Sequence, residues 1–316
     1  MATKAETLTD LSVLDNKKEF SKWKQIKEGS PFYVMLAPFM ILFTIFIIIP
    51  VLAAILLSFT DFNMLQMPKF VGVDNYLRLL LKDDVFTKAL KNTLVFAVVS
   101  GPVGYLMSFV VAWFINELSR TMKNFITLIM YAPSLAGSIY FIWTFIFAAD
   151  SKGLLNSVLI QLGIITDPIG WLTNTNYNFT CVLIVIIWSS MGTGFLALVA
   201  GFKSLDRSYF EAAAIDGIRN RWQELYFVTL PQMGPQLLFS AVQSISGAFA
   251  IGAQCAALTG NPSTNYSTHT ILLHMTDYGT TRFEMGYAST IAVVLFVIML
   301  LSWMLINKVL RKFTDD

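Results

Sequence analysis

Charged side chains are scarce in this sequence. Only 13% of its 316 residues are Asp, Glu, Lys or Arg, whereas 55% are hydrophobic; soluble domains carry about 25% charged residues. A soluble fold would leave much of this apolar material exposed in large patches. The formal charge of +2 is small, and no basic run is long, so nucleic acid is not expected as a partner.

Cysteine and histidine are also rare, with two of each in the chain. Cys181 and Cys255 both lie within apolar runs, which predicts inert buried thiols and argues against a disulfide framework. His269 and His274 are five residues apart, whereas two metal ligands on one helix are three or four apart. We therefore expect no metal site.

Charge is entirely absent from six long apolar stretches. Each has the roughly 20 residues that a helix needs to cross a bilayer core. They are residues 34–59, 94–115, 125–149, 179–202, 237–258 and 285–306. The sequence thus predicts an all-α integral membrane protein with six transmembrane helices. The shorter stretch 153–165 has a single apolar stripe and predicts a helix that lies on the membrane surface.

The positions of Lys and Arg predict the orientation of the chain. Fifteen of these 22 residues lie in the N-terminal arm (residues 1–33), the second-to-third connection, the 203–236 connection and the C-terminal tail. Cytoplasmic loops are enriched in Lys and Arg, so both termini and the 203–236 connection are predicted to be cytoplasmic. The arm, with Lys17 and Lys18 adjacent, is expected to be attracted to anionic membrane lipid.

The 203–236 connection contains the charged segment EAAAIDGIRNRWQELYFVTLP. Ser208 and Glu211 have the spacing of a capping box, and Gly217 can end the helix in the left-handed conformation. A second helix is predicted to begin at Asn220 and to stop before Pro231. On local chemistry alone, a solvated amphipathic loop is an equally good interpretation.

This segment resembles the EAA motif of ABC importer permeases, which docks on the ATPase subunits. The matching residues are Glu211, Ala212, Ala213, Asp216, Gly217, Leu230 and Pro231, with one residue more between Gly217 and Pro231 than in the commonest form. Further motifs are similar to the carbohydrate-uptake branch, of the maltose, raffinose and multiple-sugar type. They are SFTDF (58–62), FVGVDNY (70–76), NTLVF (92–96), LTGNP (258–262) and MGYAS (285–289).

The resemblance implies the type I ABC importer permease fold over residues 34–316 and a role in sugar import at the cell (inner) membrane. The chain would form half of a pore with a second homologous permease. Two ATP-binding subunits would power the pore, and this chain would dock on one of them through Glu211, Ala212, Ala213, Asp216 and Gly217. An extracytoplasmic solute-binding protein would deliver the sugar. The chain has no Gly-Lys dipeptide and so no G-x-x-x-x-G-K-[ST] phosphate loop. It is therefore expected not to be an enzyme, and ATP and Mg would be cofactors of the partner ATPase.

Polar residues within the charge-free stretches are candidates to line the path of the substrate. They are Trp188, Ser189, Ser190, Thr193, Gln243, Ser244 and Gly247. Small and hydroxyl residues also pack membrane helices together, so packing is the alternative for each of them. Gln243 fits packing least, because it is a large amide in the middle of a stretch. The resemblance places both regions where a maltose-type permease lines its sugar site.

Three points stay open at the level of sequence. His269 and His274 are expected on an outer connection, in contact with the binding protein or in a plain solvated loop. A secondary transporter that acts alone is the main rival function, but it would need charged groups within its spans to couple ions. An ABC permease for a non-sugar solute, such as glycerol phosphate or a polyol, is the other alternative.

Overall fold

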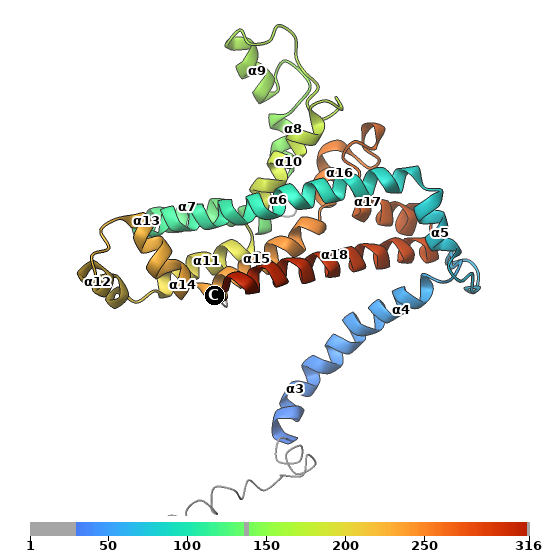
Figure 1. The fold of residues 1–316 in the computed structure, drawn as a ribbon. Helices are drawn as coiled ribbons and strands as arrows, with labels where there is room; N and C mark the ends of the chain where they lie inside the picture. Colours follow the sequence, from blue (N-terminus) through green and yellow to red (C-terminus); the bar gives the residue numbers. More distant parts are fainter. Residues whose placement is uncertain (1–29, 136–138, 315–316) are drawn as a thin grey trace, which may run out of the picture. The chain divides into compact units, whose positions relative to one another are not determined.

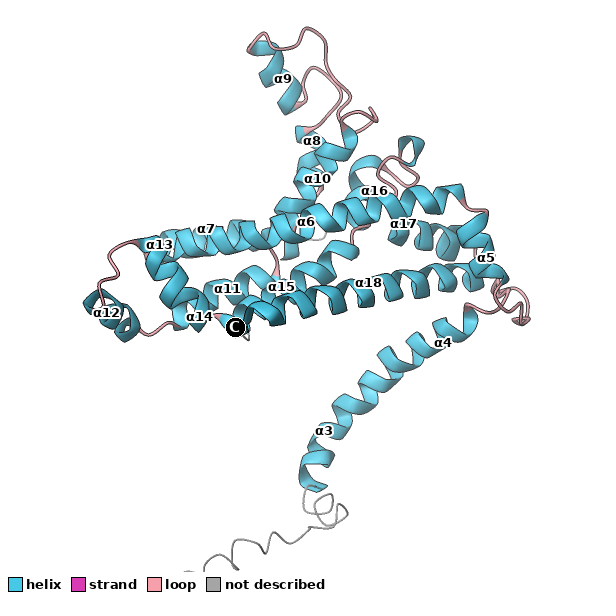
Figure 2. Cartoon of the chain, viewed as in Figure 1, coloured by secondary structure: helices cyan, strands magenta, loops and turns pink. Residues whose placement is uncertain are grey.

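The computed structural model describes residues 30–135 and 139–314, and the elements described there are helices joined by turns and loops (Figure 2). The chain divides into two units, residues 1–53 and residues 54–316. The predicted N-terminal arm, residues 1–33, lies almost entirely outside the described residues.

The first unit holds one apolar helical run. It consists of α3 (Ser30–Phe43), a π-helical turn (Thr44–Ile48) and the first residues of α4 (Ile49–Leu57). Over Pro31–Leu57 the run is 27 residues long, which is enough to cross a bilayer core. The helix predicted from the first apolar stretch is therefore present.

The second unit contains the remaining helices, from α5 to α18 (Figure 1). They are α5 (Asp74–Leu81), α6 (Asp84–Asn116), α7 (Arg120–Leu135), α8 (Phe141–Ile146), α9 (Leu154–Gln161), α10 (Asn178–Ser189), α11 (Thr193–Ser204), α12 (Arg207–Ile215), α13 (Arg221–Glu224), α14 (Leu230–Gln232), α15 (Gly234–Phe249), α16 (Ala253–Thr259), α17 (Ile271–Thr276) and α18 (Met285–Thr314). Two more π-helical turns follow α13 and α17, at Leu225–Thr229 and Asp277–Thr281. The predicted surface helix is present as α9; its place at a membrane surface stays a prediction.

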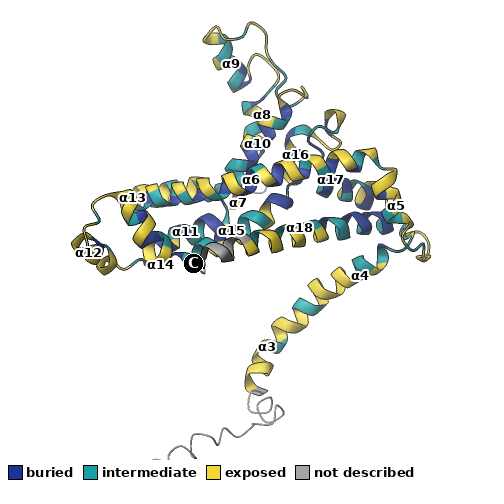
Figure 3. Cartoon of the chain, viewed as in Figure 1, coloured by how far each residue is buried: buried dark blue, intermediate teal, exposed yellow. Residues whose placement is uncertain are grey.

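The core of this unit lies where α6, α11 and α15 pack on one another, with α18 against α15. Burial is concentrated on the sides of these helices that face one another (Figure 3). Below we call the two ends of the unit the α5 end and the α12 end, after the helices that lie there in Figure 1.

Two of the predicted spans are each divided into two helices by a bend, which was not predicted from the sequence. The 179–202 stretch forms α10 and α11 with a 40° bend, and the 237–258 stretch forms α15 and α16 with a 45° bend. Gly192 and Gly252 lie in these breaks. A Cβ on Gly252 would come 2.8 Å from Leu272 Cδ2, so the bend there needs a residue without a side chain.

The number of spans follows from these bends. Three of the described helices are long and apolar enough to cross a membrane, or up to five if each bent pair counts as one span. The predicted 125–149 span corresponds to α7 and α8, which lie on either side of residues 136–138, outside the described part of the chain.

Three of the sequence motifs meet at the α5 end. The Ser58 carbonyl accepts hydrogen bonds from Asn75 Nδ2 at 3.0 Å and from Thr290 Oγ1 at 2.9 Å. Gly286 N–H donates to the Phe62 carbonyl at 2.8 Å. SFTDF, FVGVDNY and MGYAS therefore form one hydrogen-bonded joint within the second unit, which connects residues 58–62 with α5 and α18.

Candidate coupling loop and transport cavity

The loop at the α12 end begins with a well-capped helix. Asp206 Oδ1 accepts a hydrogen bond from Ser208 N–H at 3.0 Å and so caps α12. At the other end Gly217 has φ +91°, and Ile218 N–H donates to the Ala213 carbonyl while Gly217 N–H donates to that of Ala214. This pair of bonds is a Schellman motif, so the predicted role of Gly217 is confirmed.

Two local predictions for this loop were wrong. The cap is Asp206 instead of Ser208, because the Asp comes first and starts the helix two residues earlier. The second helix does not stop before Pro231: α13 continues through a π-helical turn into α14, which contains Pro231 in its first turn.

The predicted docking residues lie on and around α12. Glu211 is exposed, and its carboxylate is 3.6 Å from the Arg207 guanidinium one turn earlier. Ala212, Asp216 and Gly217 are also exposed, but Ala213 is buried. Ala213 therefore packs inside the loop, on the side where α12 contacts the Leu225–Thr229 turn. Ile215 is 87% exposed, an apolar side chain free for a partner.

The loop is tied to the end of α6. Arg221 forms an ion pair with Glu117, and the Trp222 ring lies 5.0 Å from that of Trp113 on α6. Sequence reasoning missed both contacts, since 104 residues separate the charged pair. They give the loop a fixed point on a helix that also reaches the cavity described next.

A cavity of about 330 Å³ lies at the two helix breaks. It is lined from α6, α10, α11, α15, α16 and the end of α7. The lining residues are Ser100, Ser134, Ile186, Ser189, Ser190, Gly192, Thr193, Gly194, Gln243, Ser244, Gly247, Ala248, Ala250, Ile251 and Gln254. Six of the seven predicted path residues are among them. The breaks free backbone groups from helical pairing, and non-helical backbone at membrane depth is tolerated where it lines such a cavity.

Trp188 is the exception among the predicted path residues. It is absent from the cavity lining, and its ring packs edge-on against Trp143 with the centroids 5.5 Å apart. The predicted path role of Trp188 has no support in this arrangement.

Sequence reasoning missed the polar lining residues Ser100, Ser134 and Gln254. The hydroxyl of Ser100 is buried and has no hydrogen-bond partner within the described structure. It is therefore available to a solute in the cavity. Gly192 and Gly252, in the middle of apolar runs, were the signal for the breaks.

The cavity combines uncharged polar groups with apolar side chains such as Ile186 and Ile251. Its described lining offers hydroxyl, amide and backbone groups and no charged side chain. Such a surface can both donate and accept hydrogen bonds, as the hydroxyl groups of an uncharged solute require.

The α5 end carries a groove of about 930 Å³. Its charged lining residues are Asp61, Asp74, Arg78, Lys82, Asp83 and Asp84. Arg78 pairs with Glu284 at 2.6 Å and lies over the Tyr287 ring, 4.1 Å from its centroid.

Both histidines are buried, each 2% exposed, so the predicted direct contact with the binding protein and its alternative, a solvated loop, were both wrong. His269 Nε2 lies 3.3 Å from His274 Nδ1, and His274 Nε2 lies 2.9 Å from Asp83 Oδ2. Among the described residues no group of three or more His, Cys, Asp and Glu could hold a metal ion. The two rings instead belong to a hydrogen-bonded chain.

The ionisation of this cluster follows from its surroundings. Burial opposes ionisation of Asp83, but hydrogen bonds from His274, from Phe86 N–H and from Tyr287 outweigh it and hold the pKa of this carboxyl below its usual value. Burial, and then the neighbouring His274, lower the pKa of His269 to about 4. His269 is therefore neutral at pH 7.

A family model covers most of this second unit. Residues 100–314 match the model of the binding-protein-dependent transport system inner membrane component. The chain belongs to this family. As a binding-protein-dependent transport component with several apolar helices, it is a multi-pass membrane protein whose transport involves a solute-binding protein, and the family describes a permease subunit.

Curated relatives agree with this family along nearly the whole chain. The lactose transport system permease protein of Rhizobium radiobacter is 30% identical over 279 residues, which cover 86% of this chain and 91% of the relative. The arabinooligosaccharides transport system permease protein of Bacillus subtilis is 28% identical and covers 94% of both chains.

Solved structures confirm the fold. A chain from the crystal structure of a bacterial alginate ABC transporter, in complex with an alginate pentasaccharide-bound periplasmic protein, matches with a TM-score of 0.76. The two chains are 24% identical, and the match covers 92% of this family member and 98% of the other chain. The permease fold expected from the sequence is thus shared with a transporter of known structure.

Proposed function

We propose that this chain is one of two permease subunits of an ATP-driven importer for sugars, chiefly oligosaccharides. The observation that carries the proposal is the cavity at the two helix breaks. Its lining offers hydrogen-bonding groups without charge, as an uncharged sugar needs. The lactose and arabinooligosaccharide permeases among its relatives support the same class of solute.

The proposal includes six spans with both termini in the cytoplasm. The third of these spans, predicted at residues 125–149, would include α7 and α8. The excess of Lys and Arg on the α12 side supports this orientation. The α12 loop would then dock on one of two ATP-binding subunits, which bind ATP and Mg. The groove at the α5 end would face the solute-binding protein.

The spans argue against a secondary transporter that acts alone. The six predicted stretches carry no Asp, Glu, Lys or Arg, whereas ion-coupled transport needs ionisable groups at membrane depth. Energy must then come from a partner, and the exposed α12 with Glu211 at its surface is the element suited to receive it. Transport would follow from a shift between two states of the pore, driven by the ATPase.

The test is uptake into vesicles that contain the purified complex of this chain with its partners. The panel consists of labelled lactose, arabinotriose, maltotriose, glycerol 3-phosphate and sorbitol, each with the loaded binding protein. We expect ATP-dependent uptake of an oligosaccharide, and at least about tenfold weaker uptake of it by Gln243→Ala, which removes an amide worth about 1.5 kcal/mol of hydrogen bonding.

The matched control is Ser246→Ala, on the same helix. Ser246 is exposed, bonds only to the Val242 carbonyl and does not line the cavity, so its variant should transport normally. If the complex takes up only glycerol 3-phosphate or sorbitol, the proposed sugar substrate is wrong and the chain transports a non-sugar solute. Normal uptake by Gln243→Ala would make Gln243 a packing residue.

A further inference from the structure

The groove at the α5 end and the transport cavity are connected by an unbroken run of buried contacts through α17. Asp83 begins this run. Its Oδ1 accepts from Phe86 N–H at 2.9 Å and caps α6, while its Oδ2 accepts from Tyr287 on α18 at 2.7 Å. The same Oδ2 lies 2.9 Å from His274 Nε2 on α17. One carboxylate that lines the groove therefore holds the ends of three helices.

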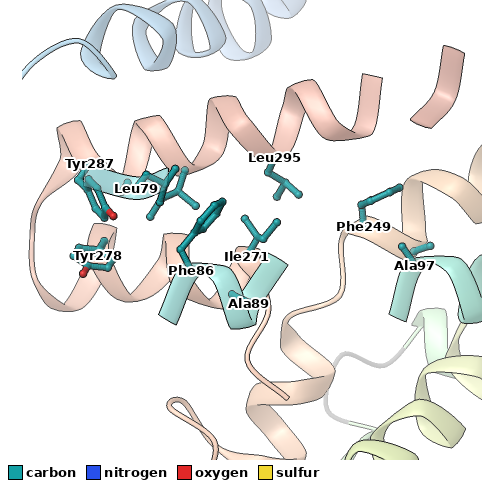
Figure 4. Packing of buried hydrophobic residues seen from close by; sticks show 12 residues of the cluster. Leu79, Phe86, Ala89, Ala97, Phe249, Ile271, Tyr278, Tyr287 and Leu295 are labelled. Atoms are coloured by element: carbon teal, nitrogen blue, oxygen red, sulfur yellow. The ribbon is translucent and has the colours of Figure 1, made fainter. Parts of the chain in front are cut away.

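The cluster around these bonds is closely packed. His274 is 2% exposed and the Asp83 side chain 9%. In Figure 4, Phe86 and Ile271 lie together beside Leu79, and the rings of Tyr278 and Tyr287 lie against each other. A charged acceptor strengthens its hydrogen bonds, and low accessibility keeps water from replacing them. The C-terminal end of α17, which carries His274, is thereby connected to the ends of α6 and α18.

The other end of α17 is fixed to the wall of the cavity. Thr270 caps α17, and its hydroxyl donates to the Ile251 carbonyl at 2.8 Å. Ile251 lies in the break between α15 and α16 and lines the cavity. Ile271 N–H, the next along the chain, donates to Thr93 Oγ1 on α6 at 2.9 Å. Leu272 fills the space that the missing side chain of Gly252 leaves in the same break.

These contacts make α17 a short rod held at both ends. Its six residues (Ile271–Thr276) span less than two turns of helix. A helix this short moves as one body, so movement of one end also moves the other end. A shift of the helix ends around Asp83 would therefore displace the Ile251 carbonyl, and with it the α15–α16 break.

We propose that Asp83, His274 and Thr270 are positioning residues that couple the groove at the α5 end to the transport cavity through α17. A partner that docks in the groove, which is the solute-binding protein if the proposed function holds, would thereby adjust the cavity wall. None of the three residues lines the transport cavity itself.

The experiment compares two variants of Thr270 in the complete importer in lipid nanodiscs. ATP hydrolysis per assembled complex is measured with and without the binding protein, loaded with whichever of lactose, arabinotriose or maltotriose the wild type takes up. Thr270→Val keeps the shape but removes the hydroxyl, and should lower the stimulation by the binding protein at least about fivefold, the lower range of allosteric coupling. Thr270→Ser keeps the hydroxyl and should retain it. Hydrolysis without the binding protein should not change.

Thr268→Val is the matched structural control. Thr268 is fully buried like Thr270, but its hydroxyl bonds to Thr259, 2.6 Å away, instead of the cavity wall, so this variant should keep the stimulation. Equal loss in Thr268→Val, or wild-type stimulation in Thr270→Val, would overturn the proposal. His274→Leu, at the other end of α17, should show the same loss and serves if Thr270→Val does not assemble.

The proposed function is tested separately, by the wild type alone. If the wild type neither retains an ATPase nor responds to a binding protein, the proposed function fails before any variant is compared. If the wild type responds and the two Thr270 variants behave alike, only the coupling through α17 fails.

Discussion

Asp83 is the side chain on which the α5 end depends most. Replacing it with Asn keeps the size but removes the negative charge that accepts from His274 and Tyr287. Hydrogen bonds to charged groups contribute about 1.5–3 kcal/mol, so Asp83→Asn should lower the free energy of unfolding by about 2 kcal/mol. Thermal unfolding of the purified complex measures the effect.

The neighbouring residue gives the control. Asp84 is exposed and lies in the first turn of α6 without a buried partner among the described residues. Asp84→Asn should therefore change stability by no more than about 0.5 kcal/mol. Equal losses in the two variants would mean that the charge near the start of α6 matters and the buried cluster does not.

His269 makes stability depend on pH. Its pKa is about 4 in the folded chain and 6.5 ordinarily, mainly because burial disfavours the charged ring, with His274 and Arg282 adding to this and Asp277 and Asp83 opposing it. The unfolded chain then binds the proton more tightly, so stability is constant above pH 6.5 and falls as the pH drops toward 4. Asp83 does not contribute to the change between pH 6.5 and pH 4. Its pKa is lowered from 3.8, so the stability that its charge provides is lost only when the pH falls below about 3.8.

The measurement is the difference in melting temperature between pH 7.5 and pH 5, for the wild type and for His269→Gln. The wild type should lose more on acidification than the variant, which has no ring to protonate. An equal loss in both would show that His269 is not the residue that titrates.

Single residues also show what a sequence can and cannot predict. The role of Gly217 could be predicted locally, because glycine adopts the left-handed conformation at a helix end without a steric penalty. His274 could not be placed in that way, because its partner Asp83 is 191 residues away and burial depends on how α6, α17 and α18 meet. Trp188 was assigned to the path because aromatic rings suit sugars; its ring contacts Trp143 and is absent from the cavity lining, and its role in the path stays a prediction.

Among the elements, α12 offers the clearest test of the coupling loop. Gly217 ends it with φ +91°, where a side chain costs about 1–2 kcal/mol even though nothing lies near its Cβ position. Gly217→Ala should therefore loosen the end of α12 and reduce the amount of ATPase that co-purifies, with little loss of the chain itself from the membrane.

Gly234 is the control for this change. It also has open space at its Cβ position, but its φ is not in the left-handed region. Gly234→Ala should keep normal amounts of ATPase, and Gly217→Asn should be intermediate, since Asn tolerates that conformation better than Ala. If Gly217→Ala keeps the full amount of ATPase, docking does not depend on the way α12 ends.

The elements divide into those that local pattern specifies and those that packing specifies. α6 and α18 could be predicted because apolar runs of about 20 residues or more form membrane-spanning helices. The bends between α10 and α11 and between α15 and α16 depend on close neighbours such as Leu272, which an apolar run does not reveal. Their glycines were the only local signal.

At the scale of the whole molecule, the chain is organised around three sites along one unit: a groove at the α5 end, a cavity at the helix breaks and an exposed loop at the α12 end. α6 reaches all three, since Asp83 precedes it, Ser100 lies within it and Trp113 stacks on the loop near its end. This arrangement suits a subunit that connects a solute on one side with an energy source on the other.

The central claim is that the energy source is a separate ATPase docked at α12. The most direct measurement is the composition of the complex, by native mass spectrometry after gentle extraction, for the wild type, for Glu211→Ala and for Arg207→Ala. In the proposed complex Glu211 pairs with a basic residue of the ATPase at a desolvated interface. Removing one partner of such a pair costs about 3–5 kcal/mol, so the Glu211→Ala complex should lose its ATPase. Arg207→Ala, which removes only the pair within α12, should keep it.

For the wild type, the account predicts one copy of this chain with one second permease and two ATPase copies. Recovery of this chain alone, or only with further copies of itself, would contradict it.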